Sequence, residues 1–298
     1  MGGDAVTYVG TAGFKYEDWR GPFYPEALPD RDMLRHYATR FGAVELDFTY
    51  YQMPAWRTIQ GITQKTPDDF MICVKANRSM THEPAADPAE LSRTCQLFAG
   101  ALEPLTAAGK LGCILLQFPW GFKAGPEGVD AIKRLREALS GLPAVVEFRN
   151  SDWISDETFA LLRELALGFC CVDEPRLRGL MPPLALATAD VGYVRFHGRN
   201  AAKWWRHDEA WERYAYLYTD AELREWVPRV KKVASAATRT FVMFNNHHAG
   251  FAPRNADMMR ELLATPGAPS ATTPGAPPAT PAAPANSPPA DLFGRDPA

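Results

Sequence analysis

The sequence predicts a (β/α)8 barrel of the TIM type, formed by a single domain. Eight short apolar runs recur along the chain, and helix-like segments separate most of them. Most of these runs are nearly continuous in hydrophobicity, as in parallel strands that are buried on both faces. An open doubly wound sheet is the main rival, but no G-x-G-x-x-G turn or P-loop follows any run. The pattern therefore favours the closed barrel.

The eight predicted strands are rich in Val, Ile, Phe, Tyr and Leu, which suits buried sheet positions. They span residues 8–12, 43–49, 70–76, 111–118, 144–149, 168–173, 192–197 and 240–245.

Three of the intervening helices have recognisable starts. Asp87 followed by Pro88 supplies an N-cap and a proline at the first helical position. Thr219 and Glu222 have the spacing of a capping box. A further N-cap at 155–156 precedes apolar residues with helical spacing. These signals place helices between the strands, as the barrel requires.

The proline content marks a boundary near residue 264. The chain has 298 residues and 26 prolines, and ten of these prolines fall within residues 265–298. A segment rich in Ala, Pro and Thr cannot bury a core and favours extended conformations. We therefore expect the barrel domain to span residues 1–264 and residues 265–298 to form a disordered tail.

Composition also bounds the class of protein and its compartment. The chain is 46% hydrophobic with a formal net charge of −3, which argues against a protein that coats nucleic acid generally. Five cysteines show no metal-type spacing, which is typical of buried thiols in a reducing compartment. The start has no apolar signal region, and no apolar run approaches membrane-spanning length. These features predict a cytoplasmic protein without a membrane partner.

Polar residues gather where the predicted strands end, which is where barrel enzymes build their sites. The candidates at these ends are Glu45, Asp47, Lys75, Gln117, Glu147, Arg149, Asp173, Arg195, His197, Asn245 and Asn246. Residues two apart on a strand share a face, so several of them should project as pairs. The plainer alternative is a buried ion-pair network that ties neighbouring strands together.

The segment after the seventh predicted strand adds cations and aromatic rings. Arg199 suits planar anions and Trp204 offers a flat face for a sugar or a base, so both are candidate ligand-binding residues. Trp211 and Tyr214 follow in the same stretch. The alternative is that these rings pack the loop against the barrel.

Several motifs together resemble the domain-of-unknown-function 72 (YecE-like) family. They are GTAGFKYEDW at 10–19, GPFYP at 21–25, VELDFTYY at 44–51, LLQFP at 115–119, VEFR at 146–149 with Trp153, YVRFHG at 193–198, and FNN at 244–246 with Asn255 and Ala256. The resemblance implies a barrel fold and the same mouth residues, without an established activity. This chain departs from the family's usual Ser, Trp, Asn, His and acidic residue at Ala12, Phe14, Asp47, Asn150 and His247 respectively.

The leading hypothesis is an enzyme that acts on a small polar molecule, anionic or sugar-like, in the barrel mouth. Glu147 and Glu45 are the predicted catalytic acid/base pair, because two carboxyl groups in unequal environments take opposite proton roles. The cationic ligand-binding candidates are Lys75, Arg149 and Arg195, which would hold an anion. The reaction would be of hydrolase, isomerase or lyase type.

Two other functions stay open at this point, as does the use of a metal. One is a nucleic-acid-binding or nuclease-like protein that uses the basic and aromatic loop near Arg199. The other is a non-catalytic sensor of small molecules. No cofactor is predicted and no metal ligands are assigned, and a divalent metal held by the carboxylates is the less favoured alternative.

Overall fold

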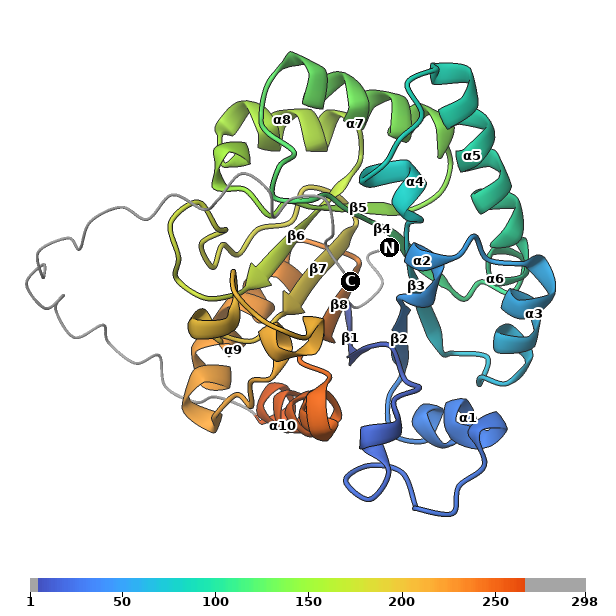
Figure 1. Cartoon of the computed structure of the whole chain (residues 1–298), viewed down its shortest axis with the longest axis vertical. Helices are drawn as coiled ribbons and strands as arrows, with labels where there is room; N and C mark the ends of the chain where they lie inside the picture. Colours follow the sequence, from blue (N-terminus) through green and yellow to red (C-terminus); the bar gives the residue numbers. More distant parts are fainter. Residues whose placement is uncertain (1–4, 266–298) are drawn as a thin grey trace, which may run out of the picture.

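The computed structural model describes residues 5–265 and contains a closed barrel of eight parallel strands (Figure 1). The strands are β1 (Val6–Ala12), β2 (Ala43–Leu46), β3 (Met71–Lys75), β4 (Leu111–Gln117), β5 (Ala144–Glu147), β6 (Gly168–Asp173), β7 (Val191–Phe196) and β8 (Arg239–Phe244). Each strand pairs with its neighbour in chain order, and β8 closes on β1. The predicted (β/α)8 barrel is therefore confirmed.

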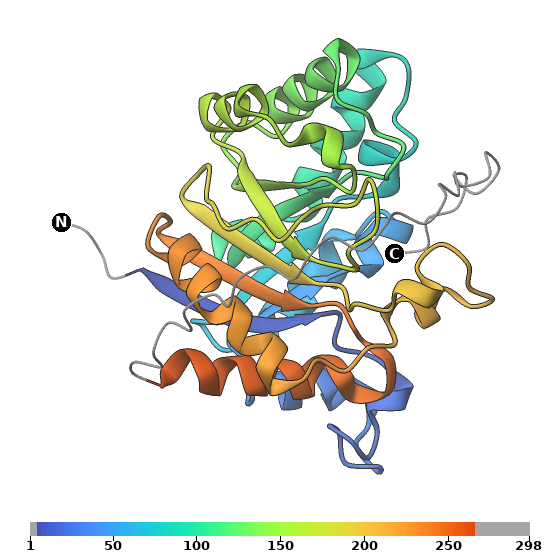
Figure 2. The same ribbon diagram turned by 90° about the vertical axis from the view of Figure 1, so that its left-hand side faces the viewer.

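The α-helices surround the strands, as both views of the ribbon show (Figures 1 and 2). They are α1 (Met33–Ala38), α2 (Phe48–Tyr51), α3 (Trp56–Gln64), α4 (Arg78–Thr81), α5 (Pro88–Ala101), α6 (Glu103–Ala107), α7 (Pro126–Ala138), α8 (Asp156–Glu164), α9 (Asp220–Ala234) and α10 (Phe251–Ala264). Short 3-10 helices occur at Glu17–Trp19, Asp30–Asp32, Ser151–Trp153, Ala201–Lys203, Ala210–Tyr214 and His248–Gly250.

The helix starts that the sequence predicts are present. The Asp87 side chain accepts a hydrogen bond from the Ala89 amide at the start of α5. Thr219 forms the capping box of α9, and Ser155 caps α8 by accepting from the Thr158 amide. Each cap satisfies an amide that the first helical turn leaves without a partner.

One predicted strand end is wrong, and one link between strands contains no helix. The second strand ends at Leu46 rather than at residue 49, because Phe48–Tyr51 turns into the short helix α2. Residues 174–190, which link β6 to β7, form no helix. Three prolines in this link, Pro175, Pro182 and Pro183, lack the amide that a helix interior needs.

The core fills both the barrel interior and the layer between strands and helices. Trp19, Trp153 and Trp226 are fully buried in this layer and in the segments that cover the barrel. All five cysteines are buried and none forms a disulfide, as the composition predicts. None of the helices in residues 5–265 combines the length and apolar character needed to cross a bilayer. The predicted tail lies, apart from Thr265, outside the described residues.

One close approach between β1 and β2 admits only glycine. Gly10 pairs with Ala43, and a Cβ atom at residue 10 would lie 2.1 Å from the Ala43 carbonyl oxygen. The Tyr37 hydroxyl donates to that same oxygen at 3.1 Å, so the carbonyl is held in place. An alanine at residue 10 would therefore push the two strands apart.

We expect Gly10→Ala to lower the free energy of unfolding by about 1–3 kcal/mol, because an overpacked site forces backbone shifts. Gly100→Ala is the matched control: residue 100 lies exposed in α5, and a Cβ there meets nothing within 4 Å. That variant should gain about 0.5–1 kcal/mol from helix propensity. Urea denaturation of both variants measures the difference, and equal stabilities would contradict the close approach.

Candidate functional site

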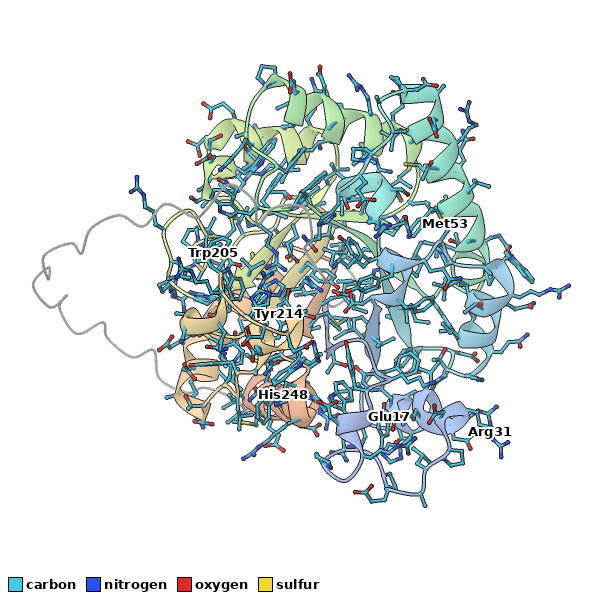
Figure 3. The ribbon with its side chains drawn as sticks, in the orientation of Figure 1. Glu17, Arg31, Met53, Trp205, Tyr214 and His248 are labelled. Atoms are coloured by element: carbon cyan, nitrogen blue, oxygen red, sulfur yellow. The ribbon has the colours of Figure 1, made fainter. Side chains whose placement is uncertain are left out.

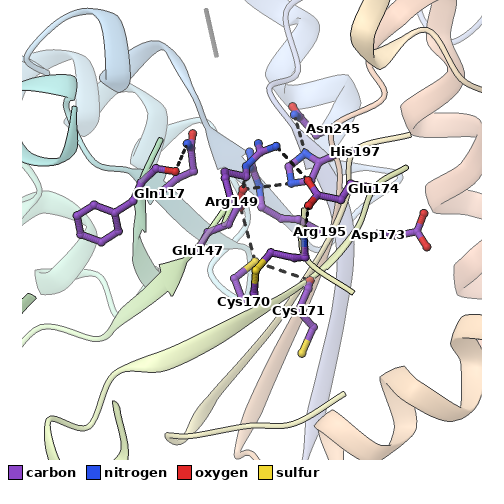
Figure 4. A network of polar contacts seen from close by, with 12 residues as sticks. Gln117, Glu147, Arg149, Cys170, Cys171, Asp173, Glu174, Arg195, His197 and Asn245 are labelled. Atoms are coloured by element: carbon purple, nitrogen blue, oxygen red, sulfur yellow. Dashed lines mark hydrogen bonds and ion pairs between the residues drawn. The ribbon is translucent and has the colours of Figure 1, made fainter. Parts of the chain in front are cut away.

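A buried arginine on β7, Arg195, links two carboxylates across the barrel interior. Figure 4 shows Arg195 beside one of them, Glu147. Arg195 Nε lies 3.0 Å from Glu45 Oε2, and Arg195 Nη2 contacts the other oxygen of the same carboxylate. Arg195 Nη1 donates to Glu147 Oε2 at 2.9 Å. Because β2, β5 and β7 are not neighbours in the barrel, these contacts run through its interior. The three predicted residues therefore come together as one network.

A second arginine extends this network toward the link after β6. Arg149 Nε lies 2.5 Å from Glu147 Oε1, and Arg149 Nη1 lies 3.5 Å from Glu174 Oε2. Glu174, which also accepts from the Met181 amide at 2.7 Å, is absent from the sequence-based candidates. It comes one residue after β6, so only the path of an irregular link directs it inward.

Glu147 is ionised, and the histidine beside it is neutral. Burial on its own would raise the Glu147 pKa, but the charges of Arg195 and Arg149 hold it well below its usual range. His197 Nε2 lies 3.2 Å from Glu147 Oε1. Burial and the charge of Arg149 lower the pKa of His197 to about 3, so its ring carries no charge at neutral pH.

The other two carboxyl groups of the network titrate near neutral pH. Burial raises the pKa of Glu45 to about 7; the charge of Arg195 opposes the rise, while the charge of Asp47 and a hydrogen bond with it add to the rise. Burial also raises the pKa of Glu174 to about 8, against the opposing charge of Arg149. The interior thus contains one permanently ionised carboxylate and two carboxyls that take up protons near pH 7.

Glu45 is fixed by two further partners. The Tyr193 hydroxyl donates to Glu45 Oε2 at 2.6 Å, a contact from β7 to β2 that strand patterning does not reveal. Asp47 lies above it, with Oδ1 3.8 Å from Arg195 Nη2 and a side chain that is 13% exposed. Asp47 is therefore the member of this group that reaches the surface.

Above the network, a cavity of about 620 Å³ opens in the barrel mouth; we call it the mouth pocket. Its lining combines aromatic rings with few charges: Gly13, Phe14, Lys15, Tyr16, Leu46, Asp47, Phe48, Tyr51, Glu209, Ala210, Trp211, Tyr214, Asn245 and His247. Tyr214, one of these lining residues, is labelled near the centre of Figure 3. Of the predicted site residues, Asp47 and Asn245 line this pocket.

A chain of polar contacts joins the mouth pocket to the network. Asn245 Nδ2 lies 3.2 Å from His197 Nδ1, and His197 Nε2 faces Glu147. Because the ring is neutral, its Nδ1 can accept from the Asn245 amide while its Nε2 lies beside the Glu147 carboxylate. The ring thus connects a pocket-lining amide to the ionised carboxylate.

Two predicted residues on the third and fourth strands lie outside the described lining of the pocket. Lys75 is buried, and its ammonium nitrogen sits 4.3 Å from the centroid of the Tyr50 ring. Gln117 Nε2 donates to the Phe118 carbonyl at 2.9 Å and lies 3.5 Å from His82 Nε2.

Asp173 lies apart from the Arg195 network (Figure 4) and forms a separate anchor with Arg199. Arg199 Nε and Nη2 each lie 2.8 Å from an oxygen of Asp173. The Tyr218 hydroxyl and the indole nitrogen of Trp226 also donate to this carboxylate, at 2.7 and 2.5 Å. Asp173 therefore ties the segment after β7, and helix α9, to the barrel.

Trp204 and Asn246 make structural contacts that hold neighbouring segments together. Trp204 is 2% exposed, and the Arg213 guanidinium lies 5.6 Å from its ring centroid. Asn246 Nδ2 donates to the Tyr216 carbonyl at 2.8 Å and to Asn255 Oδ1 at 2.9 Å. These contacts match the alternative in which the aromatic segment packs against the barrel.

No group of three or more His, Cys, Asp or Glu side chains within residues 5–265 is arranged to hold a metal ion. The two central glutamates are separated by the Arg195 guanidinium, which contacts both of them. The arrangement is suited instead to holding and transferring protons.

Sequence reasoning missed most of the aromatic lining of the mouth pocket. Phe14 and Tyr16 follow β1, and Phe48 and Tyr51 lie in α2 directly after β2. All four fall within the motifs at residues 10–19 and 44–51. The available signal was therefore the position of these rings just beyond strand ends.

Comparison with known proteins gives one consistent family. The family model described as "Protein of unknown function DUF72" matches residues 8–281. The curated UPF0759 protein YunF of Bacillus subtilis is 30% identical over 270 residues, which cover 87% of this chain and 95% of that protein.

Two crystal structures of DUF72 family proteins are similar to this one. The protein from Thermotoga maritima is 39% identical with a TM-score of 0.79, and the match covers 87% of this chain and 99% of that chain. The protein from Enterococcus faecalis is 25% identical with a TM-score of 0.78, covering 90% of this chain and 100% of that one.

We expect stability to fall as the pH rises from about 6.5 to 8. The raised pKa values of Glu45 and Glu174 mean that the folded protein binds protons which the unfolded chain releases. The stabilisation that these protons give to the folded state is complete below the ordinary carboxyl pKa. It is lost as the pH passes about 7 for Glu45 and about 8 for Glu174. The lowered pKa of His197 acts in the opposite direction, but only between about 3 and its ordinary value of 6.5.

Each proton that the folded state binds and the unfolded chain releases changes the free energy of unfolding by at most about 1.4 kcal/mol per pH unit. Glu174→Gln should flatten the decline between pH 7 and 8, while the exposed α7 variant Glu137→Gln should keep it. Chemical denaturation at stepped pH values measures these slopes. A stability that rises across this interval, or an unchanged slope in Glu174→Gln, would contradict the assignment.

Proposed function

Because the chain belongs to the DUF72 family, a family of unknown function, we propose its function from the geometry of its barrel mouth. The protein is an enzyme that binds a small polar molecule in the mouth pocket. It transfers protons to or from this molecule through the carboxyl groups of Asp47 and Glu45.

The observation that supports this proposal most is the pairing of a pocket-facing carboxyl with a buried carboxyl that titrates near pH 7. Asp47 lines the mouth pocket, and burial together with the charge of Asp47 raises the pKa of the Glu45 carboxyl. General acid–base catalysis is most effective when the pKa of the group lies near the working pH. Asp47 would therefore contact the substrate, and Glu45 would store or supply the proton behind it.

Glu147 has a different role in this proposal from the one predicted from the sequence. Its contacts with Arg195, Arg149 and His197 favour a permanently ionised state, and it is fully buried. A group held in one protonation state is a poor proton carrier. We assign Glu147 as a positioning residue, which fixes Arg195 and through it the orientation of Glu45.

The predicted anionic class of substrate gains little support from these contacts. Arg195 and Arg149, the expected anion-binding residues, are already bound to carboxylates. The aromatic lining suits a ligand with an apolar face, such as a sugar-like ring. We therefore favour a substrate without net negative charge.

The nucleic-acid alternative rests on the segment after β7, in which two of the cations have acidic partners. Arg199 binds Asp173, and the Lys203 ammonium lies 2.9 Å from Glu212. Trp204 is buried and presents no free face on which a base could stack. These observations favour the small-molecule hypothesis over the nucleic-acid one.

The test begins with a metabolite and metal thermal-shift screen on the full chain, followed by mass spectrometry for product. For a turned-over hit, Glu45→Gln and Asp47→Asn should each reduce kcat by about 10²–10⁴-fold, the usual contribution of acid–base catalysis. Glu137→Gln serves as the control and should leave kcat unchanged.

Turnover at the wild-type rate in both carboxyl variants would refute the acid/base assignment. A ligand that stabilises the wild-type protein without yielding any product would support the non-catalytic sensor instead. Steep weakening of binding as salt rises would point to phosphate contacts and to nucleic acid.

A further inference from the structure

Exposed aromatic side chains concentrate in the mouth pocket. Phe48, Tyr51 and Trp211 are 39%, 51% and 41% exposed, and all three line it. Phe14, Tyr16 and Tyr214 complete a lining with six aromatic rings. Large apolar groups left exposed together usually mark a binding site, because leaving them in water is unfavourable.

The charges of the lining are mainly negative. Asp47 and Glu209 are its acidic residues. Lys15 is the only Lys or Arg among the described lining residues, and its ammonium lies 2.9 Å from Asp30 Oδ2. Burial and the nearby His248 lower the pKa of His247 to about 4, so this lining residue is neutral at pH 7. The pocket therefore repels anions.

Asp47 has an acceptor atom that the described residues leave without a hydrogen-bond donor. Its Oδ1 is buried and makes a long ionic contact, 3.8 Å, with Arg195 Nη2, while the side chain as a whole is 13% exposed. Asp47 therefore places a carboxyl group in the pocket lining that a cationic ligand would approach from the exposed side of the side chain.

We propose that the mouth pocket binds a small organic cation, an alkylammonium or protonated amine, with its charged head against Asp47 and the aromatic rings. This proposal names the ligand class of the site assigned above and therefore rests on the proposed function.

Two physical effects act together on such a ligand. The faces of Trp and Tyr rings attract a cation through their quadrupoles. The Asp47 carboxylate adds a charge-assisted contact on the same floor. A neutral sugar would gain the stacking without the charge, and an anion would meet like charge. The cavity volume of about 620 Å³ fits a small molecule.

The experiment compares two probes of nearly the same shape on the full chain. Choline carries a quaternary nitrogen, and 3,3-dimethylbutan-1-ol replaces that nitrogen with carbon. Titrations followed by calorimetry should show choline binding about tenfold more tightly, a difference of about 1.4 kcal/mol. Tetramethylammonium should compete with choline, whereas acetate should not.

Variants locate the binding. Asp47→Asn keeps the side-chain shape and should remove most of the preference for choline over the alcohol. Trp211→Ala changes an exposed ring of the pocket and should weaken choline binding at least threefold. Trp56→Ala is the matched control, since Trp56 is exposed to a similar degree, at 42%, and lies outside the described lining.

Equal affinities for choline and the alcohol, or no measurable binding of either probe, would overturn the cation proposal. So would an equal loss of binding in Trp56→Ala and Trp211→Ala. These readouts do not require turnover. If the protein prefers choline but Glu45→Gln leaves kcat unchanged, the ligand class holds and the acid/base function is refuted. If Glu45→Gln lowers kcat but the protein shows no preference for a cation, the acid/base function holds and the ligand class is refuted.

Discussion

The contact of Arg195 with Glu45 and Glu147 is the interaction on which the barrel mouth depends. It joins three non-adjacent strands through the interior, with each of the three side chains at most 1% exposed. Burying charges costs several kcal/mol for each ion, and only close pairing offsets that cost. The guanidinium therefore fixes where both carboxylates lie, and removing it would leave Glu45 without this cationic partner and Glu147 with Arg149 alone.

This constraint divides the carboxyl groups into two kinds. Glu147 is in contact with Arg149 as well as Arg195 and stays ionised. Glu45 shares Arg195 and has Asp47 as an acidic neighbour, so the balance of burial and charge brings its pKa to about 7. The Asp47 carboxyl thus places negative charge both beside Glu45 and in the pocket lining.

Strand patterning was sufficient to predict the barrel and the set of polar strand ends, because buried parallel strands and helix caps are local properties of the sequence. It could not distinguish the role of Asp47, which lines the pocket, from that of Asp173, which anchors α9 through Trp226. That distinction depends on which face of each strand turns inward once the barrel closes. The role of Glu174 depends on an irregular link and has no local sequence signature. Trp211, by contrast, belongs to the aromatic stretch after the seventh predicted strand.

The most direct test of this account is a titration of the Glu45 carboxyl in the folded protein. Carbon-13 NMR with labelled glutamate, assigned by the loss of one signal in Glu45→Gln, follows that group alone. The account predicts a midpoint near pH 7, moving toward lower pH in Asp47→Asn because the neighbouring negative charge is removed. A midpoint near the ordinary glutamate value of 4.5, or one that Asp47→Asn leaves in place, would contradict the account.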